Sequence, residues 1–267
     1  MRTPSDNESA HRVPTAHCDT SVCSVRFAAI FPALRSPLRS GGDLSFQGRT
    51  MSRVAVFIDY QNVYRRARDV FAAPNSRSLE GQVDPLKLAY LLVERGRAID
   101  STRELRTISI FRGVPSKKRA PVGFAASQRQ GARWSAASNV TVTTRPLRYL
   151  RVGNDDGSIS WVGREKGIDV LLALAIAIGA ERDDYDVCIL CSADTDLLPA
   201  LEHARSMGKV VEVSGWKPER GYVNRLHLDR LWCHWLDRQD FETVADRTDY
   251  TRRRSARNGD NPDRPTP

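Results

Sequence analysis

The stretch Val54-Ala55-Val56-Phe57-Ile58-Asp59 indicates the architecture most directly, because five apolar residues in a row end at a carboxylate. A short continuous apolar run predicts a strand that is buried on both faces, as in a parallel sheet. A carboxylate that directly follows such a strand is costly to bury without a partner. In open α/β sheets, ligands bind outside the carboxyl ends of the strands. Asp59 is therefore the first candidate for a site residue.

Three more aspartates occupy comparable places in the chain. Asp194 and Asp196 follow the apolar run 187–191, and Asp169 lies at the start of the apolar segment 168–178. Acids from three distant segments are thus expected to meet at one edge of the sheet. Carboxylates that share a cleft repel one another unless a cation lies between them. The pattern predicts a Mg²⁺ or Mn²⁺ site, and phosphoryl chemistry commonly uses such metals.

Strand-like and helix-like segments alternate along most of the chain. This alternation predicts a three-layer α/β/α fold with a mostly parallel five-stranded sheet. With right-handed crossovers and the fourth strand beside the first, the strand order is 3-2-1-4-5. The turn residues 154–157 predict a hairpin that returns over 159–162. The expected strands are 53–59, 105–111, 140–144, 186–191 and 209–213, and the expected helices are 62–70, 84–96, 124–137, 167–179, 197–207 and 226–236.

Composition narrows the classes of partner and compartment. The chain of 267 residues has a net charge of +9, which favours polyanions such as nucleic acid. Its five cysteines form no disulfide framework, so we expect a reducing, cytoplasmic location. Cys188 and Cys191 should be buried thiols on opposite faces of one strand rather than a zinc pair. No apolar stretch reaches the roughly 18 residues that span a membrane.

Three parts are expected along the chain. Residues 1–50 lack any sustained period and are expected to be a disordered extension, which is untranslated if translation begins at Met51. Residues 51–240 are expected to form one domain that includes a C-terminal helix. Residues 241–267 are expected to be a basic disordered tail.

Three segments taken together resemble the NYN domain, a branch of the PIN-like nuclease superfamily. They are Val-Phe-Ile-Asp-Tyr-Gln-Asn (56–62), Glu-Lys-Gly-Ile-Asp-Val (165–170) and Ser-Ala-Asp-Thr-Asp-Leu-Leu-Pro (192–199), and the resemblance covers about residues 53–215. It implies a PIN-like fold and metal-dependent cleavage of RNA. Asp59, Asp169, Asp194 and Asp196 match the acids of the family, which implies that they are catalytic metal ligands.

Each of these acids also has a structural interpretation. Asp59 and Asp196 are suited to cap a helix, and the helix dipole favours Asp169 in a first turn without any metal. The sequence also departs from the family, because Ala175 stands where many members carry another acid. The departure leaves open how many metal ions the site holds.

We therefore carry forward a metal-dependent endoribonuclease and, as the alternative, an RNA-binding module without turnover. A phosphatase of the HAD type is disfavoured, because its Asp-x-Asp normally follows the first strand of the fold and here the motif follows the fourth. The sequence leaves open whether the chain forms a homodimer. The residues expected to bind substrate phosphates or water, or to orient a ligand, are Asn62, Arg112, Lys117, Lys118, Lys166, Ser192 and Thr195, and Arg119 extends their basic loop.

Overall fold

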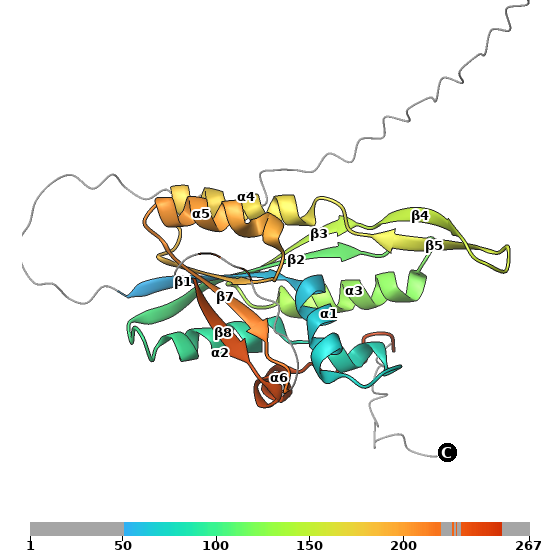
Figure 1. Cartoon of the computed structure of the whole chain (residues 1–267), viewed down its shortest axis with the longest axis horizontal. Helices are drawn as coiled ribbons and strands as arrows, with labels where there is room; N and C mark the ends of the chain where they lie inside the picture. The colour runs from blue at the N-terminus through green and yellow to red at the C-terminus, as the bar shows by residue number, and fades with distance from the viewer. Residues whose placement is uncertain (1–50, 220–225, 227, 229–230, 253–267) are drawn as a thin grey trace, which may run out of the picture. The chain divides into compact units, whose positions relative to one another are not determined.

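Six parallel strands form the central sheet of the computed structural model, which describes residues 51–219, 226, 228 and 231–252. The five predicted strands lie in the predicted order, and one further strand extends the sheet (Figure 1). In spatial order the strands are β3 (Val140–Pro146), β2 (Arg103–Val114), β1 (Ser52–Asp59), β6 (Val187–Cys191), β7 (Val210–Trp216) and β8 (Trp232–Leu236).

Helices cover both faces of this sheet, as the three-layer prediction requires. On one face, side chains of α1, α2, α3 and α6 share a core with the sheet, and on the other face α4 and α5 do so. The α-helices are α1 (Tyr60–Phe71), α2 (Pro85–Gly96), α3 (Pro121–Trp134), α4 (Ile168–Glu181), α5 (Leu198–Ser206) and α6 (Arg238–Val244), and the short 3₁₀ helices are η2 (Ser78–Gly81) and η3 (Thr195–Leu197).

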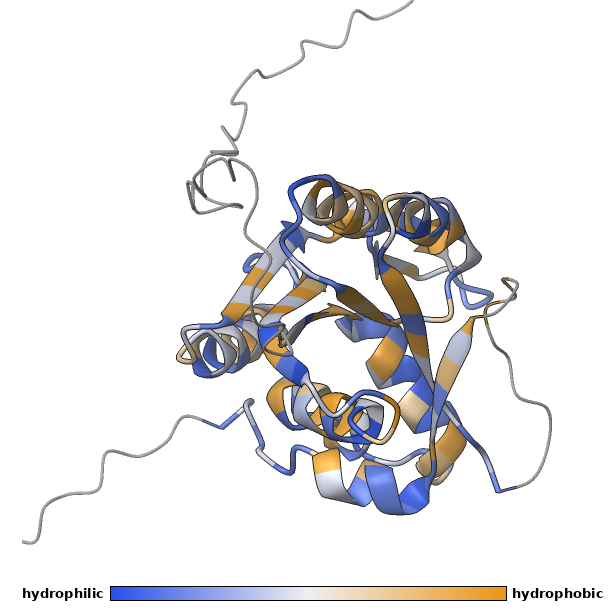
Figure 2. Ribbon diagram, turned by 90° about the vertical axis from the view of Figure 1, so that its left-hand side faces the viewer, coloured by the Kyte–Doolittle hydropathy of each residue, from blue (hydrophilic) through white to orange (hydrophobic). Residues whose placement is uncertain are grey.

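The central strands alternate their side chains between the two cores. Val56 and Ile58 belong to one core and Phe57 to the other, so β1 is buried on both faces. Figure 2 shows the corresponding concentration of orange, hydrophobic residues on the sheet and on the helix faces that meet it. The prediction for the two cysteines of β6 is confirmed, since Cys188 and Cys191 are free, buried and in different cores. Burial raises the pKa of Cys191 to about 12, so this thiol stays protonated and inert.

Local sequence signals account for the helix ends. Asp84 caps α2 by accepting the backbone N–H groups of Leu86 and Lys87, and Pro85 occupies the first turn, as predicted. Leu88 and Leu92 of this helix are fully buried. Burying a leucine side chain stabilises the fold by about 1.5–3 kcal/mol.

The predicted helix over 226–236 is wrong, because Trp232–Leu236 is the edge strand β8. Along this strand His234 and Leu236 are buried and the intervening Cys233 and Trp235 are half-buried, which is a strand period rather than a helical one. The expected domain boundary at residue 240 lies inside α6. Beyond α6, Ala245 bridges to Val83 of the domain.

A hairpin projects beyond the ends of β2 and β3 and is called the arm below (Figure 1). It consists of β4 (Arg148–Gly153) and β5 (Ile159–Arg164), which pair with each other in a separate two-stranded sheet. The predicted turn is confirmed: Asn154 and Gly157 make the backbone bonds of the turn, and Gly157 has a φ of 76°. That positive φ favours glycine.

Two further expectations concern the ends of the chain and membranes. The expected extension 1–50 lies outside the described residues, as does the last part of the expected tail. None of the helices in the described ranges combines the length and apolar character of a membrane span.

Candidate carboxylate site at the sheet edge

Asp59 ends β1 at the carboxyl edge of the sheet and also begins α1. Its Oδ1 accepts the backbone N–H of Asn62 at 3.1 Å, so the side chain caps the helix. Its Oδ2 accepts the hydroxyl of Ser192 at 3.3 Å, and the residue is only 4 % exposed. The Ser192 contact joins the ends of β1 and β6, the two strands on which the sequence had placed the candidate acids.

The loop after β6 is held against the start of α1. Asn62 accepts the backbone N–H of Ala193 at 3.2 Å, and the Ser192 hydroxyl accepts that of Asp194 at 3.2 Å. Asp194, rather than Asp196 as the structural interpretation expected, caps the short helix η3 by accepting the N–H of Asp196 at 3.0 Å. Asp194 is half-buried and Asp196 is exposed, so both carboxylates lie within reach of solvent.

Asp169 lies in the first turn of α4, which begins after Gly167. Gly167 has a φ of 77°, and a Cβ on it would lie 2.8 Å from the Arg145 guanidinium, so the turn needs glycine. Burial, followed by the charges of Asp194 and Asp196, raises the pKa of Asp169. The electrostatic coupling indicates that the three acids share one region of the sheet edge.

Burial also raises the pKa of Asp59, to about 7, against the lowering effect of its bond from Asn62. The charges of Glu165 and Asp169 raise it further. The cap on α1 and the Ser192 bond therefore do not offset the cost of placing this carboxylate among other acids. A buried acid with this pKa changes its charge near neutral pH.

Glu165 is a member of the acidic group that the sequence interpretation left without a role, although it begins the quoted segment 165–170. Its carboxylate accepts the backbone N–H of Gly113 on β2. A Cβ on Gly113 would clash with the Leu147 and Glu165 side chains, so a larger residue here would require both of them to shift. Burial raises the pKa of Glu165, and the charge of Asp169 adds to the rise.

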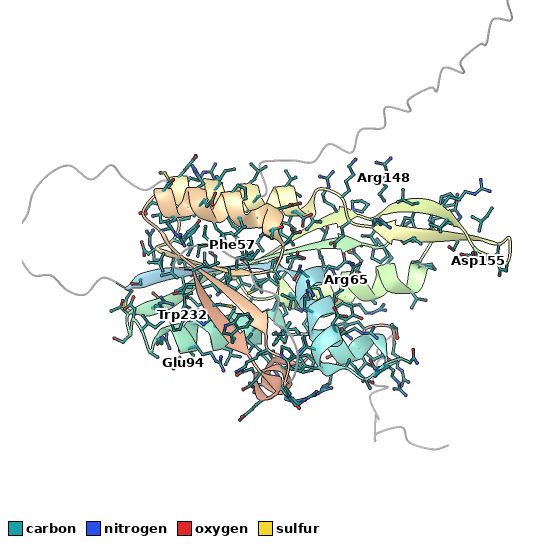
Figure 3. All side chains as sticks on the ribbon, viewed as in Figure 1. Phe57, Arg65, Glu94, Arg148, Asp155 and Trp232 are labelled. Atoms are coloured by element: carbon teal, nitrogen blue, oxygen red, sulfur yellow. The ribbon has the colours of Figure 1, made fainter. Side chains whose placement is uncertain are left out.

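Two side chains of α1, Gln61 and Arg65, form a chain of hydrogen bonds to Glu165. With its amide nitrogen toward Glu165, Gln61 donates to the two carboxylate oxygens at 2.5 and 2.7 Å. The Gln61 oxygen then accepts from Arg65 at 2.6 and 3.2 Å (Arg65 is labelled in Figure 3). These bonds fix the position of the Glu165 carboxylate without a direct ion pair.

The donor chemistry of this group fits a hard divalent cation. Its five acids offer only oxygen ligands, and none forms an ion pair with a basic side chain in the described part of the chain. Hard cations of this kind take carboxylate and water oxygens. Across the same described residues, no three acidic, histidine or cysteine side chains stand close enough to share an ion directly. The five acids are Asp59, Glu165, Asp169, Asp194 and Asp196.

The predicted substrate-binding residues fall into separate groups. Asn62 and Ser192 lie beside Asp59 and are used in the hydrogen bonds given above. Thr195 and Lys166 are exposed near the acids, in η3 and directly after Glu165. Lys117 and Lys118 are exposed in the loop between β2 and α3, as a basic loop requires.

Arg112 differs from the two lysines because its side chain turns inward. Its guanidinium donates to Gln130 at 2.6 Å and lies over the rings of Tyr60 and Trp134, at 5.0 and 5.4 Å from their centroids. Its buried Nε has no hydrogen-bond partner in the described structure. Burial lowers the pKa of Arg112, which is the expected response of a cation without a bonded carboxylate.

Arg112 and Glu165 line a cavity of about 740 Å³. Its wall includes the amides of Gln61, Gln82 and Gln130. This volume lies in the range of small-molecule binding sites. A second cavity of about 90 Å³ is lined by Asn62 and Ser192, both of which contact Asp59. Of these two cavities only the larger can accept a nucleotide-sized group, and Glu165 is the member of the acidic group that lines it.

Comparison with known proteins now decides the family. The model of the NYN domain matches residues 53–227. The chain is an NYN-domain protein. Membership gives it a PIN-like nuclease fold and a function related to RNA, and it confirms the resemblance that the three segments indicated. No curated protein matches this chain.

Two solved structures show weak likeness to this NYN-domain protein. A protein of unknown function from Vibrio parahaemolyticus is 21 % identical over 64 % of this chain and 85 % of its own, with a TM-score of 0.40. A ketoreductase domain from the bacillaene assembly line is 13 % identical over 67 % of this chain and 60 % of its own, with a TM-score of 0.17. At these scores neither structure adds an argument about function.

Proposed function

We propose that this NYN domain is a ribonuclease that hydrolyses phosphodiester bonds with a divalent cation at the acidic group. One observation carries the proposal: beyond the effect of burial, the charge of Asp169 helps to raise the pKa of Asp59, and the charges of Asp194 and Asp196 help to raise the pKa of Asp169. Helix capping accounts for Asp59 and Asp194 individually, but the raised pKa values of Asp59 and Asp169 indicate that gathering the acids costs stability. Perturbed titratable groups of this kind cluster at functional sites.

Asp59, Asp169, Asp194 and Asp196 would hold the ion, Mg²⁺ or Mn²⁺. When bound, the ion activates a water for in-line attack on phosphorus and neutralises charge on the departing oxygen. Glu165 adds a fifth acid, which compensates for the alanine at position 175. Ala175 itself is buried in the core between α4 and the sheet. Ser192 and Asn62 fix the relative positions of Asp59 and the Asp194 loop.

Arg112 and its cavity would receive a nucleotide that flanks the scissile bond. A phosphate there gains a desolvated guanidinium whose Nε lacks a partner. Lys166, Lys117 and Lys118 would hold phosphates farther along the strand, with Thr195 orienting water or a carboxylate. These contacts make binding depend on salt concentration.

The second candidate function is RNA binding without turnover. It is favoured by Ala175 and by the absence, among described residues, of three acids close enough to share an ion directly. On this alternative, Arg112 and the basic loop still bind RNA phosphates, and the acids affect only which RNA is bound.

A cleavage assay with matched variants tests the proposal. Single-stranded RNA labelled at one end is incubated with Mn²⁺ and either wild type, Asp194→Asn or Asp69→Asn. Asp69 is an exposed aspartate of α1 outside the acidic group, so Asp69→Asn controls for loss of a carboxylate. We expect Asp194→Asn to lose at least about a hundredfold in rate and Asp69→Asn to keep full activity. Equal cleavage by all three proteins would attribute the activity to a contaminant and refute the proposal.

A further inference from the structure

The arm is exposed on both faces. Its strands pair in the register Tyr149↔Gly163 and Arg151↔Trp161, so these residues share one face, called the aromatic face below. The opposite face carries the pair Leu150↔Val162. Trp161 and Val162 are neighbours in the chain, exposed to 47 % and 41 %, and point to opposite faces. Isolated two-stranded hairpins with exposed apolar residues on both faces are poorly stable in water.

The basic loop before α3 packs on the aromatic face. The Arg119 guanidinium carbon lies 3.5 Å from the centroid of the Trp161 ring and 5.6 Å from that of Tyr149. The backbone N–H of Ser116 donates to the Tyr149 hydroxyl at 3.0 Å. The loop and the arm therefore form one surface, in which the Arg119 guanidinium lies against the rings of Trp161 and Tyr149.

The surface is positive and its charges are unpaired. The two strands of the arm carry arginines and no acid; the only acids, Asp155 and Asp156, lie in the turn at the tip (Figure 3 labels Asp155 there and Arg148 near the base). No ion pair neutralises the basic residues of the arm and loop in the described structure. These basic residues are Lys117, Lys118, Arg119, Arg148, Arg151 and Arg164; of the three on the arm, Arg151 lies on the aromatic face, and Arg148 and Arg164 lie on the opposite face.

We propose that the aromatic face of the arm binds single-stranded RNA, with unpaired bases stacking at Trp161 and Arg119 and phosphates meeting Arg151 and the lysines of the basic loop. Proteins that bind single strands combine these two elements, an aromatic platform and a basic track. The inference rests on the proposed function for its substrate. Strand β5 ends at Arg164, and the next residue is Glu165 of the acidic group. An RNA strand held on the arm would thus continue toward the acids.

Binding is measured by fluorescence anisotropy with a labelled 20-nucleotide single-stranded RNA in EDTA, so that no cleavage occurs. The variants are Trp161→Ala, Trp161→Phe and the opposite-face control Val162→Ala. We expect Kd to rise about tenfold for Trp161→Ala, less than about threefold for Trp161→Phe, and negligibly for Val162→Ala. Arg151→Gln, on the aromatic face, should reduce the slope of log Kd against log salt by roughly 0.7, whereas Arg164→Gln, on the face of Val162, should leave this slope unchanged.

Several results would overturn the inference. These are wild-type affinity in Trp161→Ala, equal losses in Trp161→Ala and Val162→Ala, and no RNA binding by the wild type. Light scattering adds another: if the wild type is a dimer that Val162→Ala or Trp161→Ala dissociates while RNA affinity is unchanged, the arm joins two copies instead. Circular dichroism confirms that each variant is folded.

The failure of the arm proposal is distinguishable from failure of the nuclease proposal. If Trp161→Ala binds weakly while Asp194→Asn cleaves like wild type, the arm binds RNA and the acids are not catalytic. If Asp194→Asn is inactive while Trp161→Ala binds normally, the acids act and the arm does not hold the substrate.

Discussion

The side-chain oxygen of Asn62 accepts the backbone N–H of Ala193 at 3.2 Å, which ties the first turn of α1 to the loop that carries Asp194. Removing the bond in Asn62→Ala frees this loop and should slow RNA cleavage by about tenfold. Unfolding free energy should fall by only about 1 kcal/mol, the usual contribution of one hydrogen bond. Cleavage rates and urea denaturation of Asn62→Ala test this expectation. A variant that cleaves at the wild-type rate would show that the loop needs no such tie.

Asp59→Asn should make the metal-free protein more stable at pH 8. An unfolded Asp ionises near pH 4, whereas the pKa of Asp59 in the folded protein is about 7. Between these values the folded state keeps a proton that the unfolded state has lost, so stability falls as pH rises through this interval. The asparagine avoids the charge, and three pKa units correspond to at most about 4 kcal/mol.

Urea denaturation in EDTA at pH 8 and pH 4 checks this prediction. The difference between Asp59→Asn and wild type should be present at pH 8 and vanish near pH 4, where Asp59 is protonated in the folded state. Asparagine keeps the capping role, because it accepts the Asn62 N–H as aspartate does. Lower stability of Asp59→Asn at pH 8 would contradict the electrostatic account.

Glu165→Gln should weaken Mn²⁺ binding by about tenfold, since it removes one negative charge from the group while keeping an acceptor for Gly113. It should also lower the pKa of Asp59, because Glu165 is one of the charges that raises it. Isothermal titration with Mn²⁺ measures the affinity. Glu104→Gln, at the exposed second residue of strand β2, serves as control. Equal Mn²⁺ affinity in both variants would remove Glu165 from the site.

Glu212 is expected to matter for stability alone. It accepts two bonds from Arg103, at 2.9 and 2.6 Å, and lies 2.7 Å from His234, all buried. Removing the carboxylate in Glu212→Ala leaves the Arg103 charge buried without a counterion, which costs about 3–5 kcal/mol. Thermal and urea unfolding measure the loss. The rate of RNA cleavage per folded molecule should stay unchanged, since the buried triad of Arg103, Glu212 and His234 is not part of the acidic group.

The same triad has a defined pH dependence. Burial raises the pKa of Glu212, but the bonds from His234 and Arg103 outweigh burial, and the net pKa is lowered. Its contribution to stability is therefore full above the unfolded pKa, near 4.5, and is lost as pH falls below that value. The unfolding free energy of the wild type should therefore fall as the solution is acidified, and that of Glu212→Ala should not show this part of the fall.

Strong local patterns made most of the fold predictable. Runs such as Val54–Ile58 fix strands that are buried on both faces, and Asp84-Pro85 fixes the start of a helix. β8 escaped prediction because its inward residues include His234, whose burial depends on Glu212 of another strand. Helix α6 was missed although Asp237 and Asp240 form a capping box, since its short polar sequence resembles a tail.

The site was predictable only as far as motifs mark it. An aspartate that directly follows a buried strand can be recognised in the sequence. The position of Glu165 cannot, because it depends on a contact with Gly113, 52 positions away in the chain. Arg112 was grouped with Lys117 and Lys118 because the three are close in sequence. Only the packing of Tyr60, Trp134 and Gln130 turns its side chain into the domain.

The bond between Ser192 and Asp59 joins residues 133 positions apart in the chain. Synthesis on the ribosome must therefore pass the end of β6 before the two ends of this contact exist together. A nascent polypeptide that has emerged only as far as the arm has one acid from β1 and none from the later segments. If the domain cleaves RNA, its own messenger is thus spared during translation, because catalytic power arises only after nearly the whole domain has left the exit tunnel.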